Sequence, residues 1–316
     1  MKRSTQFVLM ATHVACAAGT YVLSKLAADG FRSPEALTLA RALGTTFVLL
    51  ALTGTLIPKP NFDGPTWAKL FGLGILHVPI NQYLFLRGLK DTAPGHAALL
   101  YAMTPLGVLL LQAAIARRFP AAVKCAGILI AFAGVLVVMR PWDHEDPHFR
   151  EIRVGDAWIA VGAVVWVVYT VAAAPMLRAH DPRTVTAWSL IVGAVLLVPF
   201  GGRELLAIDV ARIPAEAWWG LASLVLLASC VMMLLWNYLL RHLQPVEVSV
   251  GTNAQPVVTA ALTAGLHALG RPVADADLGA LFWVGTALVI AGVVMAQRRG
   301  AAAPGGANGG SPPRPA

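Results

Sequence analysis

Ten apolar runs, each close to the length of a membrane-spanning helix, most constrain how this chain can fold. A helix that crosses the hydrocarbon core of a bilayer, about 30 Å thick, needs about 20 mostly apolar residues. Of the 316 residues, 57% are apolar and only 13% are charged, which is too hydrophobic for one soluble core. The pattern predicts an all-α polytopic membrane protein with ten transmembrane helices, near residues 6–27, 34–57, 66–88, 94–116, 121–139, 154–178, 183–200, 214–240, 246–268 and 276–297.

The glycines of the fifth run are repeated in the tenth. "GILIAFAGVLVV" in the fifth run matches "GTALVIAGVVMA" in the tenth, so that Gly127 and Gly134 correspond to Gly285 and Gly292. Two glycines seven residues apart lie on one helix face and let a neighbouring backbone approach closely. The match therefore indicates an internal duplication.

Proline positions support the same duplication. The fourth and ninth runs each contain a proline near the middle, Pro105 and Pro256. The second and seventh runs each begin with a capping residue followed by a proline, Pro34 and Pro182, which is typical of a helix start. Ten runs therefore divide into five and five.

The domain organisation follows from this division. We expect a first five-helix repeat over 1–140, a connecting loop over 141–153, a second five-helix repeat over 154–299, and a disordered tail rich in Gly and Pro over 300–316. Because each half has an odd number of spans, the second half enters the bilayer from the opposite side, so the repeats are inverted. Inverted repeats around a midplane site are a recurring plan of secondary transporters, although a duplication can also simply build a stable bundle.

The charges of the loops predict the orientation. The loops on the side of the two termini carry 13 Lys and Arg residues, and the loops on the other side carry 10. Since basic loops favour the cytoplasm, both termini are expected there, with the protein in the inner membrane of the cell.

The order of these features resembles a known family. In the first run, "AAGTYVLSKLA" carries a glycine, a small polar residue and a lysine at Gly19, Thr20 and Lys25. In the second, "SPEALTLARAL" carries a proline followed by a run that ends in Arg41. Together with the repeated prolines and glycines, this order resembles the drug/metabolite transporter superfamily, in its EamA-like ten-helix branch. The family's frequent "GE" step after the fourth and ninth runs is replaced here by "ARRFP" and "LGRPV", so the role of that glutamate does not carry over.

The resemblance implies an inner-membrane carrier of small metabolites, commonly an exporter, with a central cavity formed by both halves. It implies no particular substrate.

Polar and aromatic side chains inside the runs are candidates to line such a cavity. Pro79 interrupts the backbone hydrogen bonds of the third run, next to two polar residues on one helix face. Amides from both halves beside helix-breaking prolines favour a polar midplane site, although each alone could be an interhelical hydrogen bond worth about 0.6 kcal/mol. The predicted substrate-binding or cavity residues are His13, Thr20, His77, Asn81, Tyr101, Trp166, Tyr169, Trp236, Asn237, Asn253 and Gln255.

A structural or gating role is expected for Arg41 and for three prolines. Arg41 lies about two turns into the second run, where burying an arginine costs up to about 2.5–3.5 kcal/mol. It could snorkel to the headgroups, bind loop carbonyls, or contact an anionic group of the substrate. The structural or gating interpretation is favoured because the family pattern carries this arginine whatever the substrate, and because the equivalent residue of the second half is Ser189. The prolines in this group are Pro79, Pro105 and Pro256.

The runs lack acidic residues in their interiors. A carboxylate proton relay is therefore disfavoured, as are strongly cationic substrates, whose charge would go unpaired in a low dielectric. The expected substrates are amino acids or other neutral, zwitterionic or amphipathic compounds. Proton coupling would depend on histidines such as His13 and His77, and the direction of transport is left open.

Other function classes have little support. The sequence has no HExxH, GxSxG or Walker motif, and the loop "WDHEDPHFRE" is explained as a solvated segment, so no catalytic residue, metal or cofactor is expected. The formal charge of +8 is scattered over loops and termini, so no nucleic-acid partner is expected. The expected partners are a small-molecule substrate and the lipid bilayer, and the oligomeric state is open. A non-transporting structural or regulatory membrane protein is the remaining alternative.

Overall fold

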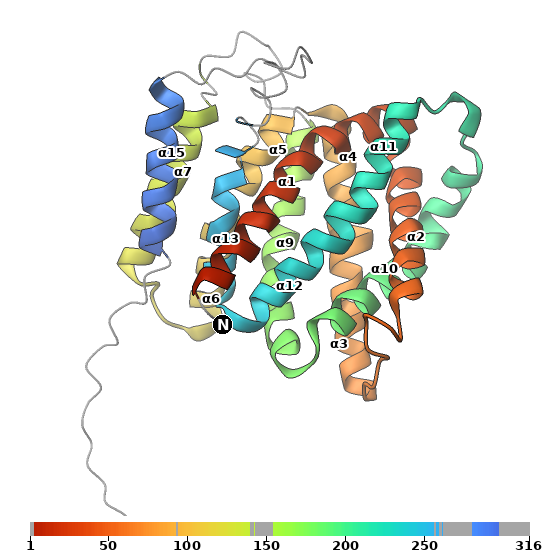
Figure 1. Ribbon diagram of the computed structural model, residues 1–316, viewed down its shortest axis with the longest axis horizontal. Coiled ribbons are helices and arrows are strands. Elements are labelled where there is room, and N and C mark those ends of the chain that lie inside the picture. The colour runs from red at the N-terminus through yellow and green to blue at the C-terminus, as the bar shows by residue number, and fades with distance from the viewer. Residues whose placement is uncertain are drawn as a thin grey trace, which may run out of the picture.

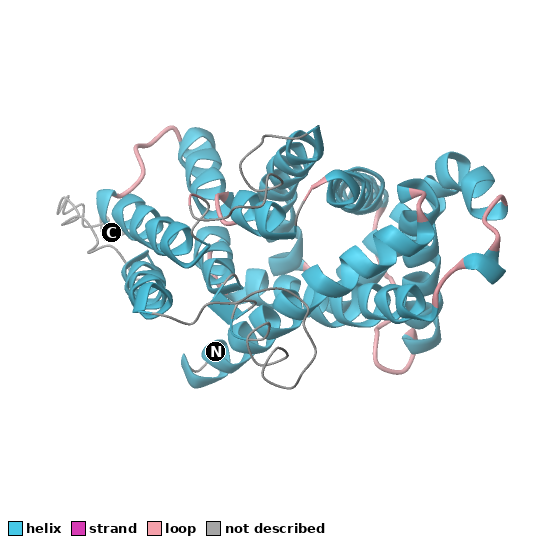
Figure 2. Cartoon of the chain, turned by 90° about the horizontal axis from the view of Figure 1, so that it is seen from above, coloured by secondary structure: helices cyan, strands magenta, loops and turns pink. Residues whose placement is uncertain are grey.

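The structure is a computed structural model in which apolar helices lie side by side. It describes residues 3–92, 94–139, 154–255 and 280–296, and the single positions 142, 257, 258 and 261. Across these residues the chain is helical, and the strand-type pairing is limited to one bridge between Thr53 and Ile57. The helices run between the two ends of the molecule in Figure 1, and Figure 2 shows them from above as an elongated bundle.

The described residues before the connecting loop form α-helices, with a π-helical segment between the third and fourth of them. They are α1 (Arg3–Phe31), α2 (Pro34–Leu52), α3 (Gly64–Ile75), the π-helical η1 (Leu76–Gln82), α4 (Tyr83–Asp91), α5 (Pro94–Tyr101), α6 (Thr104–Ala116) and α7 (Ala122–Met139).

The elements after the loop follow a similar order. They are α9 (Val154–Ala179), α10 (Pro182–Leu206), the short 3-10 helix η2 (Val210–Arg212), α11 (Ala215–Ser223), the π-helical η3 (Leu224–Met232), α12 (Met233–His242), α13 (Pro245–Gly251), the 3-10 helix η4 (Thr252–Ala254) and α15 (Ala280–Ala296).

Five described helical stretches are long and apolar enough to cross a membrane. They are Pro34–Leu52, Leu99–Ala116, Val154–Ala179, Pro182–Leu206 and Ala215–His242. The ninth predicted run is described only in its first part, and Pro256, the acidic loop segment 143–148 and the tail 300–316 lie outside the described residues.

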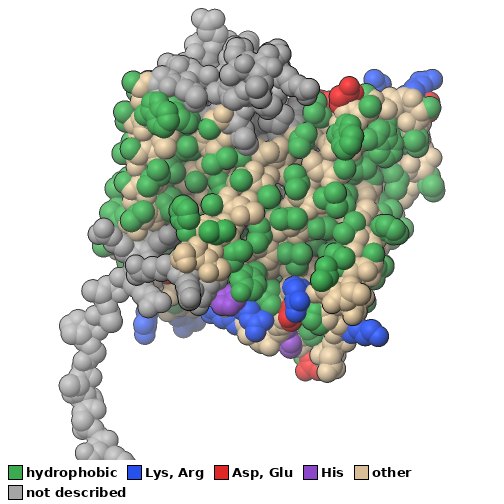
Figure 3. Space-filling view, viewed as in Figure 1, with side chains coloured by type: hydrophobic (Ala, Val, Ile, Leu, Met, Phe, Trp, Pro, Cys, Tyr) green, Lys and Arg blue, Asp and Glu red, His purple; other side chains and the backbone are tan. Residues whose placement is uncertain are grey.

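The surface of the bundle is apolar around its middle. Figure 3 shows hydrophobic side chains over the central band of the visible face and charged side chains gathered at its two ends. Large apolar side chains of the described residues are exposed, for example Phe47, which is 76% exposed, and Trp283, which is 63% exposed. Soluble proteins rarely expose such extended apolar area, whereas lipid covers it without cost. The chain is a multi-pass membrane protein.

Two of the helical stretches widen into π-helix at equivalent places. The segment η1 starts at Leu76 and η3 starts at Leu224, 148 residues later, the same separation as between Pro34 and Pro182. In η1, Pro79 has no backbone N–H and its ring crowds the preceding turn, so the normal hydrogen-bond ladder cannot form there. No proline lies in η3, so the widening there has a different origin.

Two further stretches are broken. The helix α5 ends at Tyr101, and α6 resumes at Thr104 with Pro105 in its first turn. In the second half, α13 ends at Gly251 and passes into the 3-10 turn η4. Both breaks leave carbonyl groups without the regular α-helical donor.

Glycines let pairs of helices touch backbone to backbone. The helix α7 packs along α15, and a Cβ added to Gly134 would lie 2.7 Å from the carbonyl oxygen of Gly285. The same closeness occurs between α3 and α10, where a Cβ on Gly193 would lie 2.6 Å from the carbonyl oxygen of Gly74. The glycines predicted from the repeat, and others that the repeat did not reveal, hold these contacts.

We expect Gly134→Ala to destabilise the protein by about 1–3 kcal/mol, because the new methyl group would lie within 3 Å of two backbone atoms and of the Leu288 Cβ. Gly72→Ala is the matched control, since a Cβ there meets no atom within 4 Å. The measurement is thermal unfolding of the purified variants in one detergent, followed by loss of helical signal. Equal unfolding temperatures for the two variants would contradict the close approach of α7 and α15.

A second prediction concerns the start of α10. The Asp181 carboxylate accepts hydrogen bonds from the Arg183 backbone N–H, at 2.8 Å, and from its guanidinium, and these bonds hold the pKa of Asp181 below its usual value. Asp181→Ala should therefore lower the free energy of unfolding by about 1 kcal/mol at neutral pH.

Because the pKa is lower in the folded protein, this stabilisation is fully present above the unfolded pKa of about 3.9 and is lost as the pH falls below it. Unfolding temperatures of the wild type and Asp181→Ala, compared from neutral pH down to about pH 3, test this. A gap that stays constant over that range would mean that the charge of Asp181 contributes nothing.

Candidate functional site

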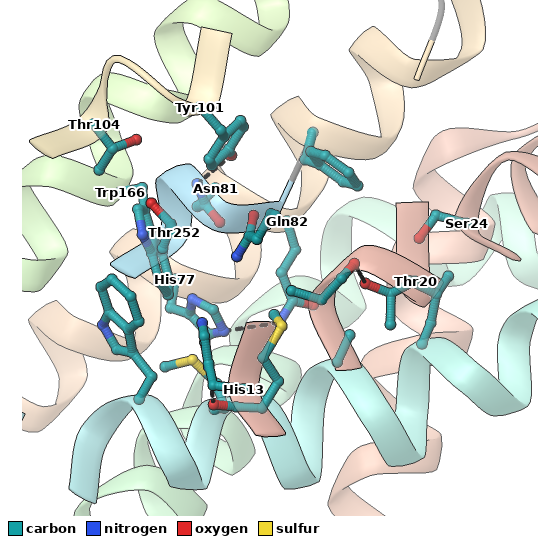
Figure 4. A pocket seen from close by; sticks show the side chains of 18 of the residues that line it. His13, Thr20, Ser24, His77, Asn81, Gln82, Tyr101, Thr104, Trp166 and Thr252 are labelled. Carbon is teal, nitrogen blue, oxygen red and sulfur yellow. Dashed lines mark hydrogen bonds between the residues drawn. The ribbon is translucent and has the colours of Figure 1, made fainter. Parts of the chain in front are cut away.

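A polar cavity lies where the irregular segments meet, inside the bundle. Its volume is about 100 Å³, and its walls come from α1, α2, η1, α4, α5, α6, α9, η3, α12 and η4. One water needs only about 10–15 Å³ of such space, so this is room for several waters or a small solute rather than a packing defect. Figure 4 shows side chains from both halves of the chain converging on it.

Most of the predicted cavity residues line this space, but not all. Those in its walls are His13, Thr20, His77, Asn81, Tyr101, Trp166, Trp236 and Gln255. Three others, Tyr169, Asn237 and Asn253, are buried in the bundle and are not part of the lining. That the lining residues bind a substrate stays a prediction.

The amide of Asn81 is fixed by bonds to both halves of the chain. Its Nδ2 donates to the Gly162 carbonyl of α9 at 2.8 Å and to the Tyr101 hydroxyl at 3.0 Å. In Figure 4 the Asn81 and Tyr101 side chains lie next to each other in the cavity wall. One amide therefore ties η1, α5 and α9 together beside the cavity.

The π-helical geometry of η1 adds a residue that the sequence did not suggest. His77 and Gln82 are five positions apart, and the His77 Nε2 and Gln82 Nε2 atoms lie 3.1 Å from each other. In an α-helix, residues three or four apart are the neighbours, whereas a π-helix pairs positions five apart. An α-helical period applied to this run therefore misses Gln82.

Several polar atoms in the cavity walls have no hydrogen-bond partner among the described residues. Buried polar groups are nearly always paired, and leaving one unpaired costs about 1–3 kcal/mol. Four such atoms belong to residues of the cavity walls and are themselves buried, so the walls carry this cost in the conformation described here. They are His77 Nδ1, Gln82 Oε1, Thr104 Oγ1 and Trp236 Nε1.

One side of the cavity is aromatic. The Trp166 ring lies 5.1 Å from the Trp236 ring and 5.6 Å from the His77 ring, measured between centroids. The His13 ring packs 5.2 Å from Trp236. These rings give one side of the cavity an aromatic surface.

Behind this wall, a second network holds the bundle together. The Asn237 Nδ2 donates to the Tyr169 hydroxyl at 3.0 Å and to the Thr186 hydroxyl at 2.8 Å. The Tyr169 ring stacks on Trp166 with centroids 5.3 Å apart. Tyr169 and Asn237 thus support the cavity wall from outside it.

Arg41 lies in the cavity wall and not at the membrane surface. Its side chain is buried, with the residue 6% exposed, and its Nε donates to the Ser229 hydroxyl of η3 at 2.9 Å. The Arg41 side chain therefore does not extend to the lipid headgroups. The described lining contains no Asp or Glu, and no set of His, Cys, Asp or Glu in the described residues could hold a metal ion.

The supporting network generates a third prediction. Tyr169→Phe keeps the stacked ring but removes the hydroxyl that Asn237 bonds, so one buried amide hydrogen loses its acceptor. We expect a loss of about 1–3 kcal/mol in unfolding free energy, measured by thermal unfolding in detergent. Tyr238→Phe on α12, where the side chain is 40% exposed, is the control and should have little effect. Equal losses in the two variants would argue against the network.

The chain is similar to known membrane transporters over nearly its whole length. A family model described as "EamA-like transporter family" matches residues 5–140 and 153–297. An "Uncharacterized transporter YyaM" of Bacillus subtilis is 26% identical over 94% of this chain and 95% of its own. An "Uncharacterized transporter" of Archaeoglobus fulgidus is 27% identical over 85% of this chain and 90% of its own.

Two further similarities concern function and fold separately. A "Probable terminal-alkyne amino-acid exporter" of Streptantibioticus cattleyicolor is 27% identical over 69% of this chain and 69% of its own. A solved structure described as "Crystal structure of protein" superposes with a TM-score of 0.64 at 20% identity, covering 94% of this chain and 98% of that one, and so shares its fold. The names of the family and of these relatives are those of transporters rather than enzymes.

Proposed function

This chain belongs to the EamA-like transporter family, and from that premise we propose that it is a secondary transporter that exports small metabolites through the cavity described above. The cargo we propose is amino acids or other neutral, zwitterionic or amphipathic compounds. The relative named as a probable amino-acid exporter supports this class of cargo.

The observation that carries the proposal is the cavity itself. Polar side chains stand among its apolar and aromatic walls, it lies inside an apolar bundle, and both halves of the chain contribute to it. A protein that only braced or scaffolded the membrane would have no use for unpaired polar atoms at this position, since each one destabilises the fold.

The mechanism we propose is alternating access. In this proposal the chain forms ten transmembrane helices as two inverted five-helix repeats, over 1–140 and 154–299, joined by the loop 141–153. The matched π-helical segments, both broken stretches and the repeated proline and glycine positions support it. Two similar halves around one site can close one face of the membrane or the other at comparable energy.

We further propose that the protein lies in the inner membrane of the cell with both termini in the cytoplasm. The greater number of basic residues in the loops on the side of the termini supports this orientation. Under the same proposal the partners are a small-molecule substrate and the lipid bilayer.

The fourth prediction tests transport by filling the cavity. Ala17 on α1 is buried in the cavity wall, whereas Ala15, two residues earlier on the same helix, is exposed on the bundle surface. In liposomes made with the purified protein, efflux of labelled aliphatic and aromatic amino acids should exceed that of empty liposomes. Ala17→Phe should reduce this efflux at least tenfold, and Ala15→Phe should leave it near the wild-type rate.

The helical signal and elution profile of both variants establish that each is folded before the fluxes are compared. An imposed pH gradient, applied in separate experiments, measures whether protons drive the flux. If Ala17→Phe and Ala15→Phe transport equally well, the solute does not pass through this cavity. If no amino acid leaves the liposomes faster than from empty ones, the proposed cargo is wrong.

A further inference from the structure

Arg41 is a buried positive charge that forms no ion pair within the part of the chain that the structure describes. It is 6% exposed and lies in the cavity wall, and its one protein hydrogen bond in the described residues joins Nε to the Ser229 hydroxyl. Within the described part of the chain, the ion pairs lie elsewhere. They are Arg87 with Asp91, Arg183 with Asp181, and Arg212 with Asp209.

A guanidinium cannot escape this situation by losing its proton, because it remains charged under all ordinary conditions. An isolated charge in an apolar interior is costly unless an opposite charge or several hydrogen bonds compensate it. An arginine with a purely structural role would donate its N–H groups to carbonyl or carboxylate oxygens. Among the described residues Arg41 donates only one of its five N–H groups, and that acceptor is a neutral hydroxyl.

The unused donors are arranged for one kind of ligand. Because Ser229 takes the Nε hydrogen, the edge formed by Nη1 and Nη2 stays available. Two parallel N–H groups on this edge match the two oxygens of a carboxylate, which gives a bidentate, charge-assisted pair. A lysine ammonium could supply the charge but not this geometry.

The rest of the cavity suits the other end of such a molecule. Trp166 and Trp236 present aromatic surface, and the polar side chain of Gln82 belongs to the same walls. The charge is also one-sided, since the equivalent residue of the second half, 148 positions after Arg41, is Ser189. A carboxylate bound by Arg41 would therefore lie in one orientation.

We propose that Arg41 binds the carboxylate of the ligand, and that the cavity selects small compounds with a carboxylate at one end and an apolar or aromatic group at the other. This rests on the proposed function only in taking the ligand to be cargo. The binding itself is a property of the cavity, and it can be tested without transport.

The experiment compares two ligands that differ only in the group that Arg41 would bind. These are 3-phenylpropionate and 3-phenylpropionamide, added to the full-length protein in detergent at constant chloride and ionic strength. Binding is followed by the fluorescence of tryptophan, because Trp166 and Trp236 line the cavity. The wild type should bind the carboxylate at least tenfold more tightly than the amide.

Two variants locate the effect. Arg41→Gln should abolish the preference for the carboxylate while leaving the weaker binding of the amide in place, and Arg41→Lys should restore part of it. Arg203→Gln is the matched control, since it removes the same charge from an exposed position on α10 and should keep the wild-type preference. A preference that survives Arg41→Gln overturns the proposal.

The comparison in the wild type decides the question even if Arg41→Gln does not fold. Equal affinities for the two ligands, or tighter binding of the amide, overturn the role of Arg41. Flux assays distinguish this from failure of the proposed function. Carboxylate binding without flux of labelled phenylalanine supports Arg41 and contradicts transport, whereas flux of phenylalanine that is unchanged in Arg41→Gln supports transport and contradicts Arg41.

Discussion

Every backbone N–H and C=O group inside a bilayer needs a hydrogen-bond partner supplied by the protein, and the rest of this structure depends on that constraint. Regular helices meet it without help, which is why the described residues are helical. Four interruptions, η1, η3, the break between α5 and α6, and η4, have residues in or beside them that line the same cavity. Irregular backbone is tolerated at membrane depth only where protein or a polar cavity surrounds it. The irregular backbone is therefore tolerated because it borders a cavity, and the cavity exists because the helices are irregular there.

A cavity also weakens the bundle, and the structure offsets this with close helix contacts away from it. In lipid, helices gain little from burying apolar side chains, so association depends on tight packing and on hydrogen bonds. Gly134 against Gly285, and Gly74 against Gly193, allow contacts between backbones that larger residues would prevent. The Asn237 amide adds two hydrogen bonds in the wall behind the cavity. The glycine contacts between helices and the hydrogen bonds of Asn237 thus stabilise a bundle that contains a cavity.

The sequence predicts the helices and much of the cavity because both depend on local signals. Hydropathy marks the runs, and Pro79 and Pro105 mark two of the irregular places in the first half. The π-helical segment η3 has no proline and so leaves no such mark. Gln82 joins the cavity only because a π-helix changes which residues are neighbours. These are consequences of geometry that composition does not contain.

Residues that need three-dimensional context are predicted less well, for a related reason. Tyr169 and Asn237 look like cavity residues in the sequence, but they bond to each other behind the wall, and a pattern cannot distinguish the two sides of a helix layer. The structural or gating role assigned to Arg41 from the sequence stays a prediction, and the structure adds that its surroundings hold one hydroxyl acceptor and no acid among the described lining residues. A buried charge with many protein partners has a structural role, whereas one with few partners is available to bind a ligand. The number of partners can be counted only in the folded chain.

The unpaired groups also bear on how a carrier of this kind would avoid moving without cargo. Closing both ends of an empty cavity would strip water from the Arg41 guanidinium, whose one hydrogen-bond acceptor among the described residues is the Ser229 hydroxyl, and this desolvation is costly. A ligand that supplies a carboxylate would remove much of that cost. Since a ligand shifts a conformational equilibrium only by its differential affinity for the two states, groups that are unsatisfied in the closed, empty state couple closure to binding. The same atoms that destabilise the fold when alone would then be those that make movement depend on the solute.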